Sequence, residues 1–211
     1  MVVIDTQLEA GSNPVIVALD STSPTQLLPL VDDLVSIGFE WFKVGLATWL
    51  SGGPQFVEML LRRRARVFLD LKLHDIPHQV HLAAKAVAGM GVELLTIHAE
   101  GGADMVDAAV TGAGDGTRVI AVTVLTSLPS TVDDVISRGR LALNAGAAGI
   151  VCSAQEAAPV RATLGDDVLL VTPGIRPEWA QTNDQKRIAS PRSALESGSS
   201  LLVIGRPITA S

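Results

Sequence analysis

The chain has 211 residues, of which 47% are hydrophobic and 3% aromatic, and its formal net charge is −6. This length suits one sizeable core, and the acidic balance argues against a nucleic-acid partner, because nucleic-acid-binding domains are more often basic. Cys152 is the only cysteine, and we expect neither a secretory leader nor a membrane span, so the composition predicts a cytoplasmic protein.

Eight short apolar runs, each ending in polar residues, recur at intervals of about one helix and two loops. They span residues 15–20, 41–45, 67–72, 94–100, 119–127, 149–153, 168–175 and 201–207. Such alternation implies parallel strands joined by helical crossovers, and eight units in this length predict a (β/α)8 TIM barrel. We expect one domain over residues 1–211 with a missing or truncated eighth helix, and a doubly wound open sheet is the alternative.

In a TIM barrel the active site lies at the carboxyl ends of the strands, so the polar residues there are site candidates. Asp70 and Lys72 are two residues apart and should face the barrel mouth, while Leu71 and Leu73 face the helices. Lys43 on the neighbouring run should lie beside Asp70. Further candidates in these positions are Asp20, Asp75, Thr126, Ser127, Arg176 and Arg206.

Lys43, Asp70, Lys72 and Asp75 would form an alternating row of charges at one end of the barrel. The alternative interpretation is purely structural, namely a buried ion-pair network that only fills the barrel. Four converging charges carry a large desolvation cost, which favours a catalytic site. A charged lysine in such a row can donate a proton to a carbanion.

The loops after the seventh and eighth runs, TPGIRP (172–177) and IGRP (204–207), are typical of a phosphate site. Gly174 and Gly205 permit close approach of the backbone to an anion. Arg206 can donate two hydrogen bonds to phosphate oxygens. Turn-forming glycines beside a surface arginine are the alternative interpretation.

The segment from Asp70 to Pro77, DLKLHDIP, resembles the D-x-K-x-x-D-I-P signature of the orotidine 5′-monophosphate decarboxylase family. Further motifs follow in that family's order, so the resemblance spans nearly the whole chain: LTS (125–127), TPGIRP (172–177), DQKR (184–187) and IGRPIT (204–209). The resemblance implies decarboxylation of orotidine 5′-monophosphate to uridine 5′-monophosphate in de novo pyrimidine synthesis. It also implies that neither a metal nor an organic cofactor is needed.

The resemblance further implies roles for individual residues. Lys72 would protonate C6 of the pyrimidine, Asp70 would face the substrate carboxylate, and Asp75 would come from the other subunit of a homodimer. The remaining residues would bind substrate: Lys43 between the ribose and Asp70, Asp20 at the ribose, Thr126 and Ser127 near the pyrimidine, Arg176, Gln185, Gly205 and Arg206 at the phosphate, and Ile76 and Gln79 beside Asp75. Gln79 stands where the family often has threonine, and it would make that contact through its amide.

Two other functions remain open at this point. A related sugar-phosphate decarboxylase or aldolase that uses Mg2+ would keep Asp70, Lys72 and Asp75 and would lose activity with a chelator. A barrel that only binds a phosphorylated ligand would not require the row of charges, and its binding would not depend on Lys72.

Overall fold

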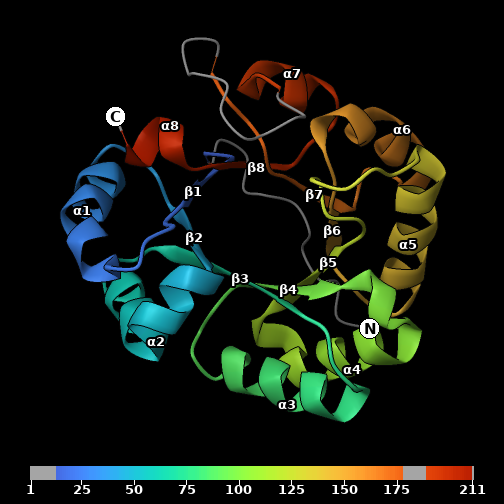
Figure 1. The fold of residues 1–211 in the computed structure, drawn as a ribbon, viewed down its shortest axis with the longest axis horizontal. Helices are drawn as coiled ribbons and strands as arrows, with labels where there is room; N and C mark the ends of the chain where they lie inside the picture. The colour runs from blue at the N-terminus through green and yellow to red at the C-terminus, as the bar shows by residue number, and fades with distance from the viewer. Residues whose placement is uncertain (1–12, 178–188, 211) are drawn as a thin grey trace.

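The computed structural model describes residues 13–177 and 189–210, and within them eight parallel strands close into a barrel. Each strand pairs with the next along the chain, and β8 pairs with β1. The closed ring, visible in Figure 1, confirms the TIM barrel and excludes the open sheet. The strands are β1 Val15–Ala18, β2 Trp41–Gly45, β3 Arg66–Leu73, β4 Leu94–His98, β5 Arg118–Val122, β6 Gly149–Val151, β7 Leu169–Thr172 and β8 Leu201–Ile204.

The helices lie outside the ring of strands (Figure 1). They are α1 Leu28–Ser36, α2 Leu46–Leu61, α3 Pro77–Ala88, α4 Ala103–Ala113, α5 Val132–Asn144, α6 Ala154–Leu164, α7 Pro191–Glu196 and α8 Arg206–Thr209. The eighth helix, expected to be missing or truncated, is present as the four-residue α8. None of the helices in the described ranges is long and apolar enough to cross a bilayer.

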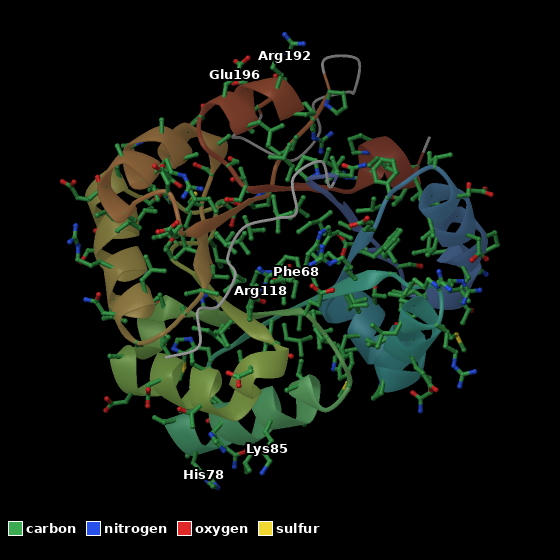
Figure 2. The ribbon with its side chains drawn as sticks, turned by 180° about the vertical axis from the view of Figure 1, so that it is seen from behind. Phe68, His78, Lys85, Arg118, Arg192 and Glu196 are labelled. Carbon is green, nitrogen blue, oxygen red and sulfur yellow. The ribbon has the colours of Figure 1, made fainter. Side chains whose placement is uncertain are left out.

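The described residues form three apolar clusters, and the two larger ones follow from the alternation of side chains along each strand. Inward residues such as Ile16, Trp41 and Leu94 fill the barrel, and outward residues such as Val17 and Leu95 pack beneath the helices. Figure 2 shows Phe68 inside the ring, whereas His78 and Lys85 project from the outer face of α3. The barrel interior is therefore packed with side chains and is not a pore.

The amino-terminal end of the barrel is closed by charged residues around an aromatic ring. The Arg66 guanidinium lies 4.2 Å from the centroid of Trp41, at cation–π distance, and donates to Glu93 at 2.7 Å. This arrangement covers the barrel interior at the amino-terminal ends of the strands and leaves the carboxyl ends of the strands as the mouth.

Several strands end earlier than the apolar runs predicted, and the largest difference is at β5. That run extends to Ser127, but β5 ends at Val122. The chain then curls, because the Thr123 hydroxyl donates to the carbonyl of Val151 and the Leu128 amide donates to the carbonyl of Leu125. The assignment of Thr126 and Ser127 to a strand end is thus wrong, and both lie on the following loop.

Candidate active site

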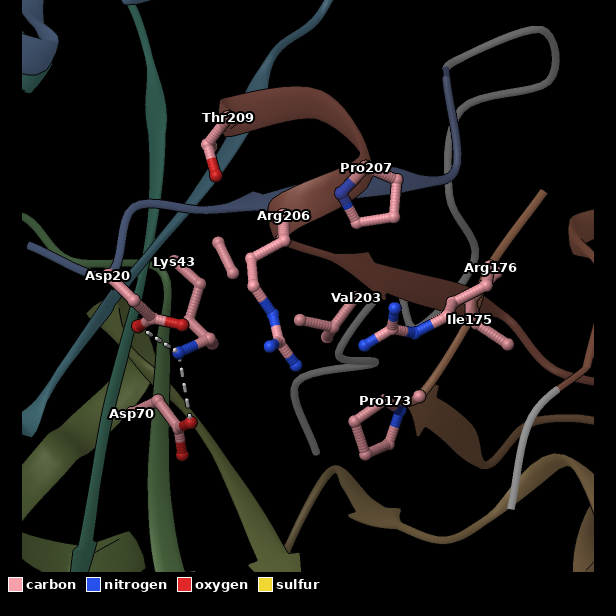
Figure 3. Close-up of a pocket in the computed structure, with 13 residues that line it drawn as sticks. Asp20, Lys43, Asp70, Pro173, Ile175, Arg176, Val203, Arg206, Pro207 and Thr209 are labelled. Carbon is pink, nitrogen blue, oxygen red and sulfur yellow. Dashed lines mark hydrogen bonds and ion pairs between the residues drawn. The ribbon is translucent and has the colours of Figure 1, made fainter. Parts of the chain in front are cut away.

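A cavity of about 480 Å³ opens at the carboxyl ends of β1, β2, β7 and β8. Its charged lining consists of Asp20, Lys43, Asp70, Arg176 and Arg206 (Figure 3). Acidic groups occupy one side of this cavity and two arginines the other. A ligand that carries both hydroxyl groups and an anionic group would suit such a lining.

A smaller cavity of about 140 Å³ adjoins the first and shares Lys43 and Asp70 with it. Its walls are mostly apolar and include Phe68, Val122 and Leu125. Its other polar lining comes from Lys72 and Thr126. The site therefore combines a charged chamber with a small apolar chamber, and the two meet at Lys43 and Asp70.

Four charged side chains form a continuous row at this junction, which we call the charge row: Asp20 just after β1, Lys43 on β2, and Asp70 and Lys72 on β3. Lys43 Nζ lies 3.1 Å from Asp20 Oδ1 and 3.5 Å from Asp70 Oδ2, and Lys72 Nζ lies 2.7 Å from Asp70 Oδ1. The side chains of Lys43 and Asp70 are only 11% and 13% exposed, so solvent screens their interaction weakly. The strand ends thus place Lys43 beside Asp70 and Asp70 beside Lys72.

Asp70 is the centre of the charge row. Burial acts to raise the pKa of its carboxyl, but Lys43, Lys72 and hydrogen bonds from Lys72 and Thr96 outweigh burial and hold the pKa below its usual value. Asp70 is therefore an anion at neutral pH, deep in a site that the sequence already marked as polar. The hydrogen bond from Thr96 has no counterpart in the sequence-based prediction.

Within one chain, Asp20 joins the charge row beside Lys43, whereas Asp75 lies outside it, and its expected contribution from a second subunit stays a prediction. Asp75 is exposed beyond β3, and its carboxylate accepts a hydrogen bond from the Ile76 amide at 2.6 Å. Ile76 is 63% exposed and Gln79 is also exposed. Among the described residues of one chain, none of these three side chains lines either cavity.

The arginine side of the larger cavity comes from the ends of β7 and β8. Arg176 is buried, whereas Arg206 is exposed, and Figure 3 shows both guanidinium groups extending into the same part of the cavity. Gly174 precedes them with a φ of 79°, a conformation that favours glycine. Gly205 also lines the cavity, and Gln185 lies outside the described residues.

The structure separates the two loop residues expected near the pyrimidine. Thr126 lines the smaller cavity, whereas Ser127 is exposed and absent from the described lining of both cavities. As for metals, no group of three or more histidine, cysteine, aspartate or glutamate side chains within the described ranges is arranged to hold an ion.

Three residues that support the site were missed from the sequence. The Thr48 hydroxyl donates to the carbonyl of Leu19 and accepts from the amide of Ser21, so it brackets Asp20. Gly45 leaves room for the ion pair of Lys43 with Asp20. Thr96 contacts Asp70 and Lys72. A threonine or glycine surrounded by apolar residues carries no sequence signal for such contacts.

Comparison with known proteins gives a consistent result. Residues 13–211 match the model of the Orotidine 5′-phosphate decarboxylase / HUMPS family. A protein named orotidine 5′-phosphate decarboxylase from Anaeromyxobacter sp. (strain K) is 50% identical over 177 residues, covering 79% of this chain and 78% of its own. One of the same name from a Nostoc species is 43% identical, covering 95% and 92%. The crystal structure of orotidine 5′-phosphate decarboxylase from Lactobacillus acidophilus has a TM-score of 0.80 at 35% identity and covers 95% and 93%.

Proposed function

This chain belongs to the Orotidine 5′-phosphate decarboxylase / HUMPS family, and on that premise we propose that it converts orotidine 5′-monophosphate to uridine 5′-monophosphate and carbon dioxide in pyrimidine synthesis. The observation that carries the proposal is the charge row of Asp20, Lys43, Asp70 and Lys72 at the junction of the two cavities. A site that only bound a nucleotide would not need a buried anion between two ammonium groups.

The two cavities suit the two ends of this substrate. The phosphate would lie in the larger cavity, where Arg176 and Arg206 can supply charge-assisted, forked hydrogen bonds. The ribose hydroxyls would lie between Asp20 and Lys43. The pyrimidine would then enter the smaller cavity, with its C6 carboxylate towards Asp70 and with Thr126 near the ring.

In the reaction, the bond between C6 and the carboxylate carbon breaks, carbon dioxide leaves, and the electron pair stays on C6. The Lys72 ammonium donates a proton to C6, which forms the product, and Lys72 later recovers a proton from water. Lys43 and Lys72 also supply preorganised positive charge around the developing carbanion. Asp70 would disfavour the substrate carboxylate, and the apolar walls of the smaller cavity suit neutral carbon dioxide better than a carboxylate.

The experiment that tests the proposal follows the ultraviolet absorbance of orotidine 5′-monophosphate with EDTA present. Wild-type protein should turn over, and Lys72→Ala should lower kcat by about 100-fold or more, the usual range for loss of a proton donor. The control Lys85→Ala removes an exposed lysine on the outer face of α3 and should keep full activity. A folded, dimeric wild type without turnover would sink the proposal, and activity lost with EDTA would favour the Mg2+-dependent relatives.

We propose further that the enzyme works as a homodimer in which Asp75, Ile76 and Gln79 reach the partner's site. Support comes from their position: all three are exposed next to the mouth of the barrel, and Ile76 is an exposed apolar side chain. Gln79 would contact the substrate through its amide.

Mixing inactive Lys72→Ala and Asp75→Asn chains tests the contribution from the partner. Each mixed dimer would hold one site with both residues intact, so about half of the wild-type activity per dimer should return, by the symmetry of a two-fold interface. Verified mixed dimers that stay inactive would contradict a contribution of Asp75 to the partner's site.

A cytoplasmic location belongs to the same proposal. It is supported by the single cysteine, Cys152, which is buried and leaves no partner for a disulfide within the sequence. Cell fractionation with an antibody against the protein would test it, and recovery outside the cytoplasmic fraction would contradict it.

A further inference from the structure

Thr96 lies in the interior of the barrel, on the central residue of β4. Its neighbours Leu95 and Ile97 pack beneath the helices, whereas Leu94, two residues before it, belongs to the core inside the barrel. The alternation of side chains therefore directs Thr96 inward, where it is fully buried. It is a polar residue of the barrel interior, on the strand next to β3, which carries Asp70 and Lys72.

The hydroxyl of Thr96 connects Asp70 and Lys72, the two residues of the charge row that lie on β3. It donates to Asp70 Oδ1 at 2.9 Å and accepts from the backbone amide of Lys72 at 2.9 Å. A hydroxyl has a single proton, so the proton goes to the carboxylate and a lone pair serves the amide. One atom thus fixes the carboxylate of Asp70 and the backbone of Lys72 at the same time.

The backbone at Lys72 needs such a partner. Lys72 has a φ of 51°, which is unusual for a residue with a side chain, and the register between β3 and β4 shifts between Leu69 and Leu73. The shifted backbone directs the Lys72 amide to a side-chain acceptor on β4, which Thr96 provides. Strained backbone of this kind persists only where the surroundings hold it.

We propose that Thr96 is a positioning residue, which sets the relative geometry of the Asp70 carboxylate and the Lys72 ammonium for proton transfer. The inference rests on the proposed decarboxylase function and adds a residue that does not touch the substrate. Asp70 Oδ1 then receives two donors, Lys72 Nζ at 2.7 Å and Thr96 Oγ1 at 2.9 Å. Loss of Thr96 would free both the carboxylate and the strained backbone that carries Lys72.

Two substitutions separate the hydroxyl from the shape of the side chain. Thr96→Val keeps the volume and removes the hydroxyl, and it should lower kcat by about 10- to 100-fold, as loss of a buried hydrogen bond at the reacting geometry predicts. KM should change by less than about 3-fold, because the larger cavity is untouched. Thr96→Ser keeps the hydroxyl and should stay within about 5-fold of the wild-type kcat.

Thr117 provides the matched control. Thr117 lies just before β5, at the amino-terminal end of the barrel, and is also buried. Its hydroxyl donates to the carbonyl of Val92. Thr117→Val should lower the melting temperature and leave kcat unchanged. A fall in kcat with Thr117→Val equal to that with Thr96→Val would mean that general loosening of the barrel explains both.

A readout without turnover keeps this inference distinguishable from the proposed function. The carboxyl resonance of Asp70, identified by its loss in Asp70→Asn, should titrate at higher pH in Thr96→Val than in wild type. Lys43 on β2 and Lys72 on β3 face the same carboxylate and remain in the variant, so the difference reports the lost donor. If wild type failed to turn over the substrate, only the decarboxylase proposal would fall.

Three results would overturn the positioning role. They are a wild-type kcat in folded Thr96→Val, a Thr96→Ser variant as slow as Thr96→Val at equal melting temperature, and an Asp70 titration that does not move. The expected results are a slow valine variant, a rescued serine variant and an upward shift of the Asp70 titration.

Discussion

A Cβ atom at Gly45 would lie 2.9 Å from Nζ of Lys43, which is closer than real Cβ contacts allow. The same atom would lie 2.9 Å from Oδ1 of Asp20, the carboxylate that Lys43 contacts at 3.1 Å. Glycine at this position, opposite Asp70 in the β2–β3 register, therefore makes room for the ion pair. The two threatened atoms are ends of side chains, so an added methyl group would displace them before it disturbed the backbone.

Gly45→Ala should consequently impair activity more than stability. We expect kcat/KM to fall by about 10-fold or more, equivalent to about 1.4 kcal/mol, while the melting temperature changes little. Gly116→Ala is the control, because a Cβ at Gly116 would meet open space. Full activity in Gly45→Ala would show that the Lys43–Asp20 pair tolerates displacement.

Thr48→Val tests whether the position of Asp20 depends on its anchored neighbours. The Asp20 side chain is 62% exposed, so packing does not hold it, whereas the Thr48 hydroxyl ties the backbone at Leu19 and Ser21. We expect a loss in kcat/KM of about 5- to 20-fold and near-normal activity in Thr48→Ser.

The control for Thr48 is the same substitution in an Asp20→Ala background. If Thr48 acts through Asp20, the second change should add little, because effects on one unit are not additive. Multiplicative losses in the double variant would instead assign Thr48 a separate role.

Arg206→Ala should weaken recognition of the phosphate specifically. Loss of charge-assisted hydrogen bonds predicts an increase in KM for orotidine 5′-monophosphate of about 10- to 100-fold. Activity on orotidine, which lacks the phosphate, should be the same in Arg206→Ala as in wild type. Arg192→Ala removes an exposed arginine that points away from the barrel (Figure 2) and should behave as wild type. Equal losses with both substrates would place Arg206 away from the phosphate.

Acid should destabilise the fold partly through His98 at the end of β4. Burial lowers the pKa of His98 below 6.5, and the nearby His74 and Lys72 lower it further. As the pH falls, the unfolded chain protonates His98 before the folded chain does. The contribution of neutral His98 to stability is therefore complete above about pH 6.5, and it is lost as the pH falls towards the lower pKa of the folded state.

His98→Gln should accordingly show a weaker decline in melting temperature than wild type as the pH is lowered from 6.5, as measured by circular dichroism. Parallel curves for the two proteins would assign the acid sensitivity to other groups, among them Asp70, whose lowered pKa acts in the same direction.

The barrel itself could be predicted because each apolar run alternates with a helix, and the charged strand ends could be predicted because Lys43, Asp70 and Lys72 lie within the second and third runs. Adjacent strands then put Lys43 beside Asp70 without further information. The end of β5 could not be predicted, because Val124 and Leu125 continue the apolar run beyond Val122. Asp75 followed its strand as expected, yet one chain leaves it exposed, and its proposed role needs a second copy.

The contacts of Thr48 and Thr96 lie beyond any reading of local sequence. Thr96 meets an aspartate 26 positions away, and Thr48 meets a carbonyl 29 positions away, so only the register of neighbouring strands and loops reveals these pairs. The strained backbone at Lys72 is equally invisible, since its cause is a shift in pairing between β3 and β4.

The packed lower barrel also constrains the order of events in a catalytic cycle. Ile16, Trp41 and Leu94 fill the interior, and Arg66 covers Trp41 from below, so the described residues leave one passage to the charge row. Under the proposed function, the substrate would enter and both products would leave through that passage, so entry and exit could not occur at the same time. Uridine 5′-monophosphate would then exclude the next substrate until it departed, which makes it a competitive inhibitor and makes its release a candidate for the slowest step.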